Sequence, residues 1–208
     1  MNGFDSRKES SHSIVVALAG KNKKILEFGC GKGFVSEQLK KNACRVTAVE
    51  INPESAKLAE KFCEKIFLGN IETMDFSKVG EGFDIAIFGD VLEHLKNPPE
   101  ILEKTKKLLD ENGRIIVSVP NIANWKIRLK LLFGKFDYAS EGILDRTHLK
   151  FFTLETIKKT VQEAGFGIEK VFFVPSAPVP TMAMKKLFSR VLPAAFSFQF
   201  VILAGVLK

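Results

Sequence analysis

Two short segments near the N-terminus constrain the fold more than any other part of the chain. Residues 25–33 (ILEFGCGKG) predict a strand that enters a turn with three glycines, and residues 45–50 (RVTAVE) predict a strand that ends in a carboxylate. Glycines in such a turn let the backbone approach a ligand closely, and an acid at the end of the next strand can accept both hydroxyls of a ribose. Together the segments predict a nucleotide-cofactor pocket in an α/β fold.

The glycine spacing and the acid before the turn favour one kind of nucleotide. A dinucleotide fingerprint places its third glycine three residues after the second, whereas Gly33 follows Gly31 by two. Glu27 precedes the turn, and a carboxylate there would repel a pyrophosphate but attract the ammonium of an amino-acid moiety. The arrangement resembles the first motif, acid-x-Gly-x-Gly-x-Gly, of class I S-adenosylmethionine (SAM)-dependent methyltransferases.

Further motifs resemble one branch of that family, the ubiquinone-biosynthesis O-methyltransferase type within the methyltransferase type 11/12/23 group. Residues 89–95 (GDVLEHL) carry the Glu-His signature of this branch, and residues 109–121 match it as well. The resemblance covers roughly residues 20–170. It implies methyl transfer from SAM to a small-molecule acceptor, with a hydroxyl favoured and with S-adenosyl-L-homocysteine as the product.

Alternating strands and helices predict a doubly wound α/β sheet. The predicted strands are 24–28, 45–50, 65–68, 83–88, 114–119, 168–174 and 198–207, and the predicted helices are 11–20, 34–42, 52–63, 98–109, 154–164 and 184–192. We expect Asn112 and Gly113 to end the helix 98–109. The resemblance implies a Rossmann-like sheet of seven strands in the order 3-2-1-4-5-7-6, with the last strand antiparallel.

The chain of 208 residues, 46% of them hydrophobic, fits a single methyltransferase domain, 1–208, with a full core. Residues 121–152 interrupt the alternation after the fifth strand and are too long for a plain connection, so we interpret them as a lid or substrate insertion. Residues 175–196 are predicted to form a second cap segment.

Residues 124–133 predict an amphipathic helix inside the insertion. Its apolar face holds Trp125, Leu129, Leu132 and Phe133, and another face holds Lys126 and Lys130. This helix is expected either to act as a lid that touches substrate or membrane, or to pack on the domain with a solvated basic face.

The resemblance implies cofactor contacts from both segments and from the residues after the third and fourth strands. The candidates are Glu27, Gly29, Cys30, Gly31, Glu50, Ile51, Asn70, Ile71 and Asp90. Glu27 and Asp90 would orient the amino-acid end of SAM, and Glu50 would bind the ribose. Asn70 replaces the aspartate usual in the family and can still accept a hydrogen bond from the adenine amino group. Ile51 would pack on the adenine or belong to the core.

Two histidines are candidate catalytic residues. His94 and His148 would face the acceptor, and either could act as a general base. Asp90, Glu93 and His94 have the i, i+3, i+4 spacing of one helical turn, so with His148 they could instead bind a divalent metal, as in some relatives. A third alternative is structural, with Glu93 capping backbone amides and His148 holding the lid.

Charge and cysteine content bound the partners. Residues 1–120 carry 18 basic and 18 acidic side chains, so the net charge of +7 comes entirely from the later part of the chain. This distribution favours an anionic or lipid-like small molecule, a peripheral membrane contact or RNA, or it reflects surface lysines alone. Cys30, Cys44 and Cys63 lack metal-ligand spacing and are expected to be reduced packing residues.

Two other functions are compatible with the sequence. The first is a metal-assisted RNA 2′-O-methyltransferase that uses the basic C-terminal part, although the chain has no separate RNA-binding module. The second is a noncatalytic SAM-binding accessory protein. The N-terminus lacks an apolar signal segment and residues 196–207 are too few to span a bilayer as a helix, so the cytoplasm is expected. The acceptor and the oligomeric state have no sequence signature.

Overall fold

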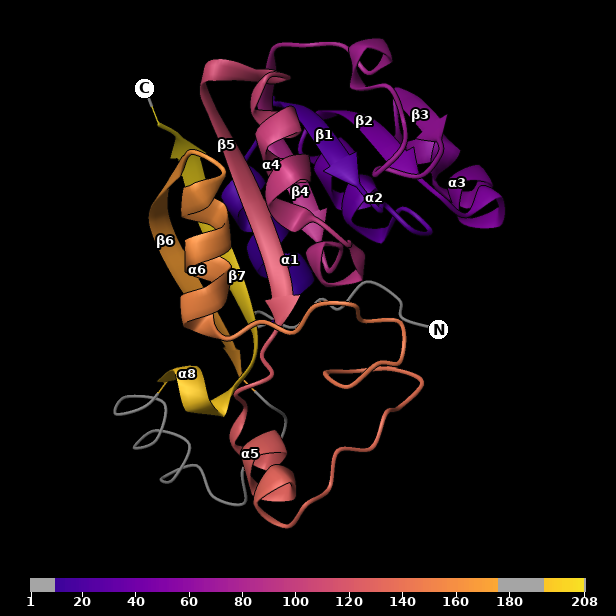
Figure 1. The fold of residues 1–208 in the computed structure, drawn as a ribbon. Coiled ribbons are helices and arrows are strands. Elements are labelled where there is room, and N and C mark those ends of the chain that lie inside the picture. Colours follow the sequence, from indigo (N-terminus) through magenta and orange to yellow (C-terminus); the bar gives the residue numbers. More distant parts are fainter. Residues whose placement is uncertain (1–9, 176–192, 208) are drawn as a thin grey trace.

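The computed structural model describes residues 10–175 and 193–207, which form a seven-stranded sheet covered by helices (Figure 1). The strand order is β3-β2-β1-β4-β5-β7-β6, and β7 is antiparallel to both of its neighbours. The strands are β1 (Lys24–Phe28), β2 (Arg45–Glu50), β3 (Lys65–Leu68), β4 (Phe83–Gly89), β5 (Leu109–Pro120), β6 (Phe166–Pro175) and β7 (Ser197–Val206). The predicted fold class and strand order are confirmed.

The central strands are apolar on both faces because helices cover both sides of the sheet. Successive residues of a strand point to opposite faces. Ile25 accordingly belongs to one buried cluster with Ile85, whereas Leu26 belongs to a second cluster with Ala86. Each face of the sheet therefore has its own core.

Two groups of helices supply the outer layers. On one face lie α1 (Ser11–Ala19), α2 (Phe34–Lys41) and α3 (Pro53–Ala59), and on the other lie α4 (Pro98–Lys106) and α6 (Leu154–Glu163) (Figure 1). Asn52 caps α3 by accepting a hydrogen bond from the Ser55 amide, and Pro53 occupies the first turn. Short 3₁₀ helices span Glu60–Phe62, Phe76–Lys78 and Leu92–His94.

Two predicted helix ends were wrong. The helix expected over residues 52–63 changes to the first 3₁₀ helix at Glu60. The helix expected to run to Leu109 ends at Lys106, and Asn112 and Gly113 lie inside β5. Extra residues bulge out of β5 there, because Phe83 pairs with Leu109 but Ile85, two residues later, pairs with Arg114. Gly113 fits inside this bulge, where a Cβ would lie 2.6 Å from the Leu109 Cβ. The Asn-Gly pair thus shapes a bulge and does not end a helix.

Residues 121–152 leave the sheet and return to it. Asn121 and Phe152 form an isolated β-bridge, so the two ends of the predicted insertion lie side by side. Between them, α5 (Trp125–Leu132) and a long loop lie beyond the end of β5, away from the sheet (Figure 1). Ile127, Ile143 and Leu144 give this excursion a small buried cluster separate from the two main cores.

Part of the predicted second cap cannot be compared. The helix predicted over residues 184–192 lies outside the described residues, and of the segment 175–196 only Pro175 and the short helix α8 (Pro193–Phe196) are described. Within the described ranges, no helix has both the length and the apolar character needed to cross a membrane.

Candidate active site

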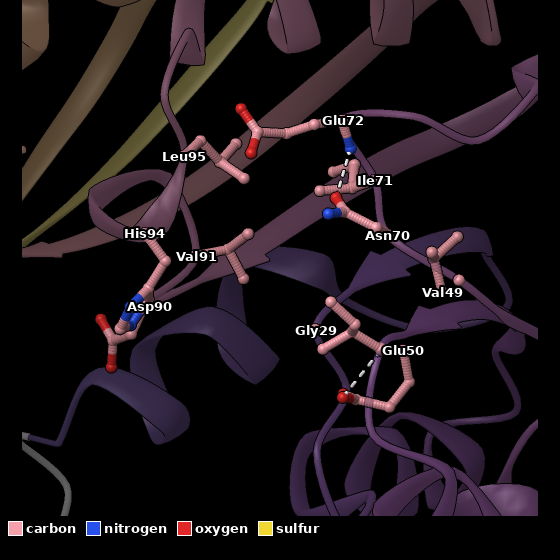
Figure 2. A pocket seen from close by; sticks show the side chains of 12 residues that line it. Gly29, Val49, Glu50, Asn70, Ile71, Glu72, Asp90, Val91, His94 and Leu95 are labelled. Carbon is pink, nitrogen blue, oxygen red and sulfur yellow. Dashed lines mark hydrogen bonds between the residues drawn. The ribbon is translucent and has the colours of Figure 1, made fainter. Parts of the chain in front are cut away.

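A pocket of about 270 Å³ opens at the carboxyl ends of β1, β2 and β4. This edge is where open parallel sheets bind their ligands. Figure 2 shows Glu50 and Asn70 on one side of the pocket and Asp90 and His94 on the opposite side. The lining residues are Gly29, Val49, Glu50, Ile51, Gly69, Asn70, Ile71, Glu72, Asp90, Val91, His94 and Leu95.

The glycine turn allows the chain to pass close to the pocket. Gly29 has a φ of +67°, and a Cβ built on it would lie 2.6 Å from the Cγ2 atom of Val91. Gly33 has a φ of +80°, and its Cβ would lie 2.9 Å from the Ala59 Cα. Both positions thus require glycine, because the backbone conformation has a positive φ and because the neighbouring atoms leave no room for a Cβ.

Glu50 is buried and held by three backbone amides. Its Oε2 accepts a hydrogen bond of 2.7 Å from the Gly31 amide, and its Oε1 accepts bonds of 2.9 Å from the amides of Ile51 and Asn52. The carboxylate therefore joins the end of β2 to the glycine turn. The two amides on Oε1 use both of its lone pairs, whereas Oε2 keeps one, so the group can still accept a bond from a ligand.

The residues after β2 and β3 form the wall beside Glu50. Ile51 is 65% exposed, which rules out the core alternative for this side chain. Asn70 Oδ1 accepts a hydrogen bond of 2.8 Å from the Glu72 amide (Figure 2). The oxygen expected to face the adenine therefore already stabilises a turn, and it retains one lone pair.

Glu27 lies beneath the glycine turn and not in the pocket lining. Its carboxylate accepts a hydrogen bond of 2.5 Å from the Ser36 hydroxyl. Burial raises the pKa of Glu27 to about 7, against the opposing effect of the Ser36 bond. Cys30 and Gly31, two other predicted cofactor contacts, also fall outside the lining. All three cysteines are free, and Cys30 and Cys44 are buried.

The predicted helical turn from Asp90 to His94 was wrong. Asp90 has a φ of +55° and precedes the 3₁₀ helix Leu92–His94, so it does not share a helical face with Glu93 and His94. Its Oδ1 instead accepts a hydrogen bond of 2.7 Å from the Ser118 hydroxyl of β5. The side-chain nitrogen Nε2 of Gln199, in β7, lies 2.9 Å from each carboxylate oxygen of Asp90. Asp90 is thus fixed by two neighbouring strands.

Glu93, His94 and His148 do come together. One ligand atom from each of the three lies within 4.8 Å of the others. Glu93 is 1% exposed, and neither of its carboxylate oxygens has a hydrogen-bond partner among the described residues. Burial and the nearby Asp90 charge raise its pKa well above the ordinary value. Both effects favour the uncharged acid of Glu93.

Backbone hydrogen bonds join the later loop to this turn. The amides of Leu149 and Lys150 donate to the Glu93 carbonyl, at 2.8 and 2.9 Å. The alternative that the Glu93 side chain caps backbone amides is wrong, because the main-chain carbonyl accepts these bonds and the side chain accepts none from the residues that the structure describes.

Hydrogen bonds set the tautomers of the two histidines. His148 Nδ1 lies 3.1 Å from the Ile143 carbonyl oxygen, and His94 Nδ1 lies 3.2 Å from the Thr147 carbonyl oxygen. Since a carbonyl can only accept, each Nδ1 carries a hydrogen, and in the neutral form of each ring Nε2 is the nitrogen with the free lone pair. Burial lowers the pKa of His148, and the lower pKa favours the neutral ring. The hydrogen bond to Ile143 partly offsets this effect.

A row of aromatic rings extends from the histidines into the insertion. The His94 and His148 ring centroids are 4.8 Å apart, and His148 lies 6.2 Å from Phe151. Phe151 in turn contacts Phe136 at 5.9 Å and Tyr138 at 6.5 Å. The insertion therefore reaches the rim of the pocket through ring contacts.

Several residues of the site had no sequence signal. Ser118 and Gln199 hold Asp90 from positions 28 and 109 residues away, and only the β5–β7 pairing brings them near. Val91 and Leu95 line the pocket but belong to an apolar pattern typical of core. Glu72, which also lines the pocket, accepts a hydrogen bond from the Lys96 amide.

Comparison with known proteins identifies relatives of the whole fold. A family model described as a methyltransferase domain matches residues 7–171. The ubiquinone biosynthesis O-methyltransferase of Psychrobacter arcticus is 32% identical over 162 residues, which cover 73% of this chain and 61% of that protein. The enzyme of the same name from Psychrobacter cryohalolentis is 29% identical over 174 residues, covering 78% of this chain and 65% of that protein. The chain thus spans less than two thirds of the length of these relatives.

Solved structures share the architecture at low sequence identity. A SAM-dependent methyltransferase from Archaeoglobus fulgidus superposes with a TM-score of 0.65 at 19% identity, covering 94% of this chain and 95% of that one. Magnesium protoporphyrin IX methyltransferase from Synechocystis, with bound S-adenosylhomocysteine, gives a TM-score of 0.66 at 16% identity, covering 94% and 82%. These similarities establish the fold.

Proposed function

Since this chain belongs to the SAM-dependent methyltransferases, we propose that it methylates a hydroxyl of a small-molecule acceptor. The observation that carries the proposal is the pocket between the Glu50 carboxylate and His94, whose ring lies against that of His148. A ribose-binding acid and a proton acceptor on opposite sides of one pocket fit a cofactor and an acceptor that meet between them. The names of the O-methyltransferase relatives support oxygen as the acceptor atom.

SAM would lie along the carboxyl edge of the sheet. Glu50 would bind the ribose through the free lone pair of Oε2, and the exposed Ile51 side chain would cover the adenine together with Ile71. Asn70 would accept from the adenine amino group through its remaining lone pair. Asp90, fixed by Ser118 and Gln199, would orient the amino-acid end.

Glu27, Cys30 and Gly31 would act differently from the pocket lining. Gly31 presents its amide to Glu50, so it would position the ribose acid. Glu27 and Cys30 lie under the turn and would fix its shape. A cofactor ammonium above the turn would favour the charged form of Glu27. Because the pKa of Glu27 is about 7, its charged and uncharged forms are close in free energy at neutral pH.

The transfer step would need little from side chains beyond orientation and one base. SAM, when bound, would supply an electrophilic sulfonium methyl, and the pocket would hold the acceptor oxygen in line with that methyl and its carbon–sulfur bond. The Nε2 atom of His148 or His94 would take the hydroxyl proton. His148 is suited to this role because burial lowers its pKa and so favours the form with a free lone pair on Nε2. The insertion 121–152 would cover the acceptor and exclude water, with Phe151 beside the histidine.

Separate effects on binding and transfer test these roles. We expect Glu50→Ala to weaken SAM binding by at least about 100-fold in calorimetry, because charged hydrogen bonds to the ribose are lost. His148→Ala should bind SAM normally and lose about 100-fold in turnover. Glu54→Ala, at an exposed acid of α3, is the matched control and should change neither. Equal loss of binding in the Glu50 and His148 variants would contradict the division of roles.

One observation favours a second candidate, metal-assisted deprotonation of the acceptor. Glu93 has two unpartnered buried oxygens, and the His94 and His148 nitrogens are nearby. A carboxylate and two imidazoles fit a divalent ion, which would acidify a bound hydroxyl. For the base mechanism we expect chelator-treated enzyme and Glu93→Gln to retain turnover. Loss of turnover on chelation, with recovery on adding Mg²⁺ or Mn²⁺, would establish the metal instead.

A further inference from the structure

We propose that Cys30 and Cys63 form a modification site, a pair of thiols that peroxide oxidises to a disulfide, and that this disulfide weakens SAM binding. Cys30 lies in the glycine turn between Gly29 and Gly31, and Cys63 directly follows the first 3₁₀ helix. Both are free thiols in the structure. The inference concerns the cofactor pocket alone, so it depends neither on the identity of the acceptor nor on the base.

Packing brings the two cysteines together. Cys30 belongs to a small buried cluster with Ala59, and Cys63 packs against that cluster. The segment before Cys63 also lies against the glycine turn, because a Cβ on Gly33 would meet the Cδ2 atom of Phe62 at 2.9 Å. A hydrogen bond joins the side chains of Cys30 and Cys63. Two thiols in contact are the arrangement from which a disulfide forms with little backbone movement.

Cys63 is the thiol that meets the peroxide. It is half-buried, whereas Cys30 is only 6% exposed. The hydrogen bond from Cys30 lowers the pKa of the Cys63 thiol, and the charge of Lys40 acts in the same direction, against the effect of burial. Lys40 is held nearby by a hydrogen bond of 2.7 Å to the Lys61 carbonyl. A partly exposed thiol with a lowered pKa supplies the thiolate, the form that peroxides oxidise.

Oxidation takes two steps, in which two electrons pass from the thiols to one hydrogen peroxide. The Cys63 thiolate attacks a peroxide oxygen, the oxygen–oxygen bond breaks, and hydroxide leaves a sulfenic acid on Cys63. The Cys30 sulfur then attacks the Cys63 sulfur and gives up its proton, and the sulfur–oxygen bond breaks with loss of water. The hydrogen bond to Cys63 raises the pKa of Cys30 in the reduced pair, and the first step removes this effect because the thiolate is consumed. A dithiol reductant returns the two electrons.

The disulfide acts on the cofactor pocket through the glycine turn. The amide of Gly31, the residue after Cys30, donates the hydrogen bond of 2.7 Å to Glu50 Oε2. The residue after Cys63 is tied to β2 by a backbone hydrogen bond of 2.7 Å, so the partner cysteine is fixed from its own side. Linking Cys30 to Cys63 therefore draws the turn toward the 3₁₀ helix and takes the Gly31 amide away from the carboxylate that would bind the ribose.

Mass spectrometry and calorimetry of the full chain test the proposal. We expect hydrogen peroxide to give a protein that has lost the mass of two hydrogen atoms, with peptides of Cys30 and Cys63 joined, and that binds SAM about tenfold more weakly. Dithiothreitol should reverse both changes. Cys63→Ser should bind SAM like untreated wild type, before and after peroxide. Cys44→Ser, at a buried free cysteine outside the pair, is the matched control and should respond to peroxide like wild type.

Four results would overturn the proposal. Treated wild type could keep all its thiols, or Cys63 could gain oxygen atoms without forming the cross-link. The cross-linked protein could bind SAM with unchanged affinity, or Cys63→Ser could lose affinity on treatment as wild type does. Because the readouts are the cross-link and SAM binding, a wrong acceptor or a wrong base in the proposed function would produce none of these results.

Discussion

The side-chain nitrogen Nε2 of Gln199 lies 2.9 Å from both carboxylate oxygens of Asp90, 109 residues earlier in the chain. Gln199 enters the site from β7, the antiparallel strand, and Asp90 follows β4. The Ser118 hydroxyl, from the strand between them in the sheet, completes the contact. Asp90 thus receives its orientation from the strand that enters the sheet last in the sequence.

The Asp90–Gln199 contact predicts an order of effects on SAM affinity. Gln199→Ala removes one donor and should weaken SAM binding several-fold, because Asp90 is then held by Ser118 alone. Gln199→Glu should be worse, since two carboxylates would repel at this distance. Calorimetry at neutral pH measures both effects. Wild-type affinity in both variants would show that Asp90 does not orient the cofactor.

Glu27 predicts a pH dependence of stability. Its pKa is about 4.5 when unfolded and about 7 when folded, so between these values the folded protein binds more protons. The contribution of Glu27 to stability is therefore fully present below pH 4.5, decreases as pH rises through about 7, and is constant above. The total change is about 3 kcal/mol.

Urea unfolding of wild type and Glu27→Gln across this range measures that contribution. The free energy of unfolding of wild type relative to the variant should decrease by about 3 kcal/mol from pH 4.5 to pH 8. Subtracting the free energy of unfolding of the glutamine variant at each pH removes the pH dependence that comes from all other groups. A constant difference would mean that Glu27 keeps an ordinary pKa in the folded protein.

Two glycines of the turn predict different responses to alanine. Both have positive φ, so each substitution costs about 1–3 kcal/mol of backbone strain. A Cβ at Gly31 meets no atom within 4 Å, whereas at Gly29 it meets Val91 at 2.6 Å. Gly29→Ala should therefore destabilise the protein by about 1–3 kcal/mol more than Gly31→Ala.

Thermal or urea unfolding checks this difference, and a second substitution identifies its cause. Adding Val91→Ala to Gly29→Ala should recover the extra loss, because the shorter side chain removes the contact, but should leave the backbone strain. Equal stability of the Gly29 and Gly31 single variants would show that the turn relaxes away from Val91.

The sheet could be predicted well from sequence because its signals are local. β1, β2 and β3 have the predicted bounds, and Glu50 lies at the end of β2, beside the pocket. The Asn112-Gly113 pair misled the prediction because the same dipeptide suits a helix end and a strand bulge. The pairing of β5 with β4 decides between a helix end and a bulge, and this pairing joins residues that are far apart in the sequence.

The candidate site was less predictable because long-range contacts complete it. The sequence predicted that His94 and His148 belong to the site. It could not predict that the amides of Leu149 and Lys150 bind the Glu93 main-chain carbonyl and so bring His148 to His94, because a main-chain contact has no sequence signature. The i, i+3, i+4 spacing failed for Asp90 because its positive φ precedes the 3₁₀ helix. The amphipathic pattern of residues 124–133 predicted α5 but could not show which apolar side chains face outward.

Methyl transfer from labelled SAM into fractionated cell extract tests the central claim most directly, with Glu50→Ala as the blank. We predict that wild-type protein places label on a small-molecule fraction as a methyl ether, and that the blank places none. Label in RNA, or no label in any fraction while calorimetry shows intact SAM binding, would contradict transfer to a small-molecule hydroxyl.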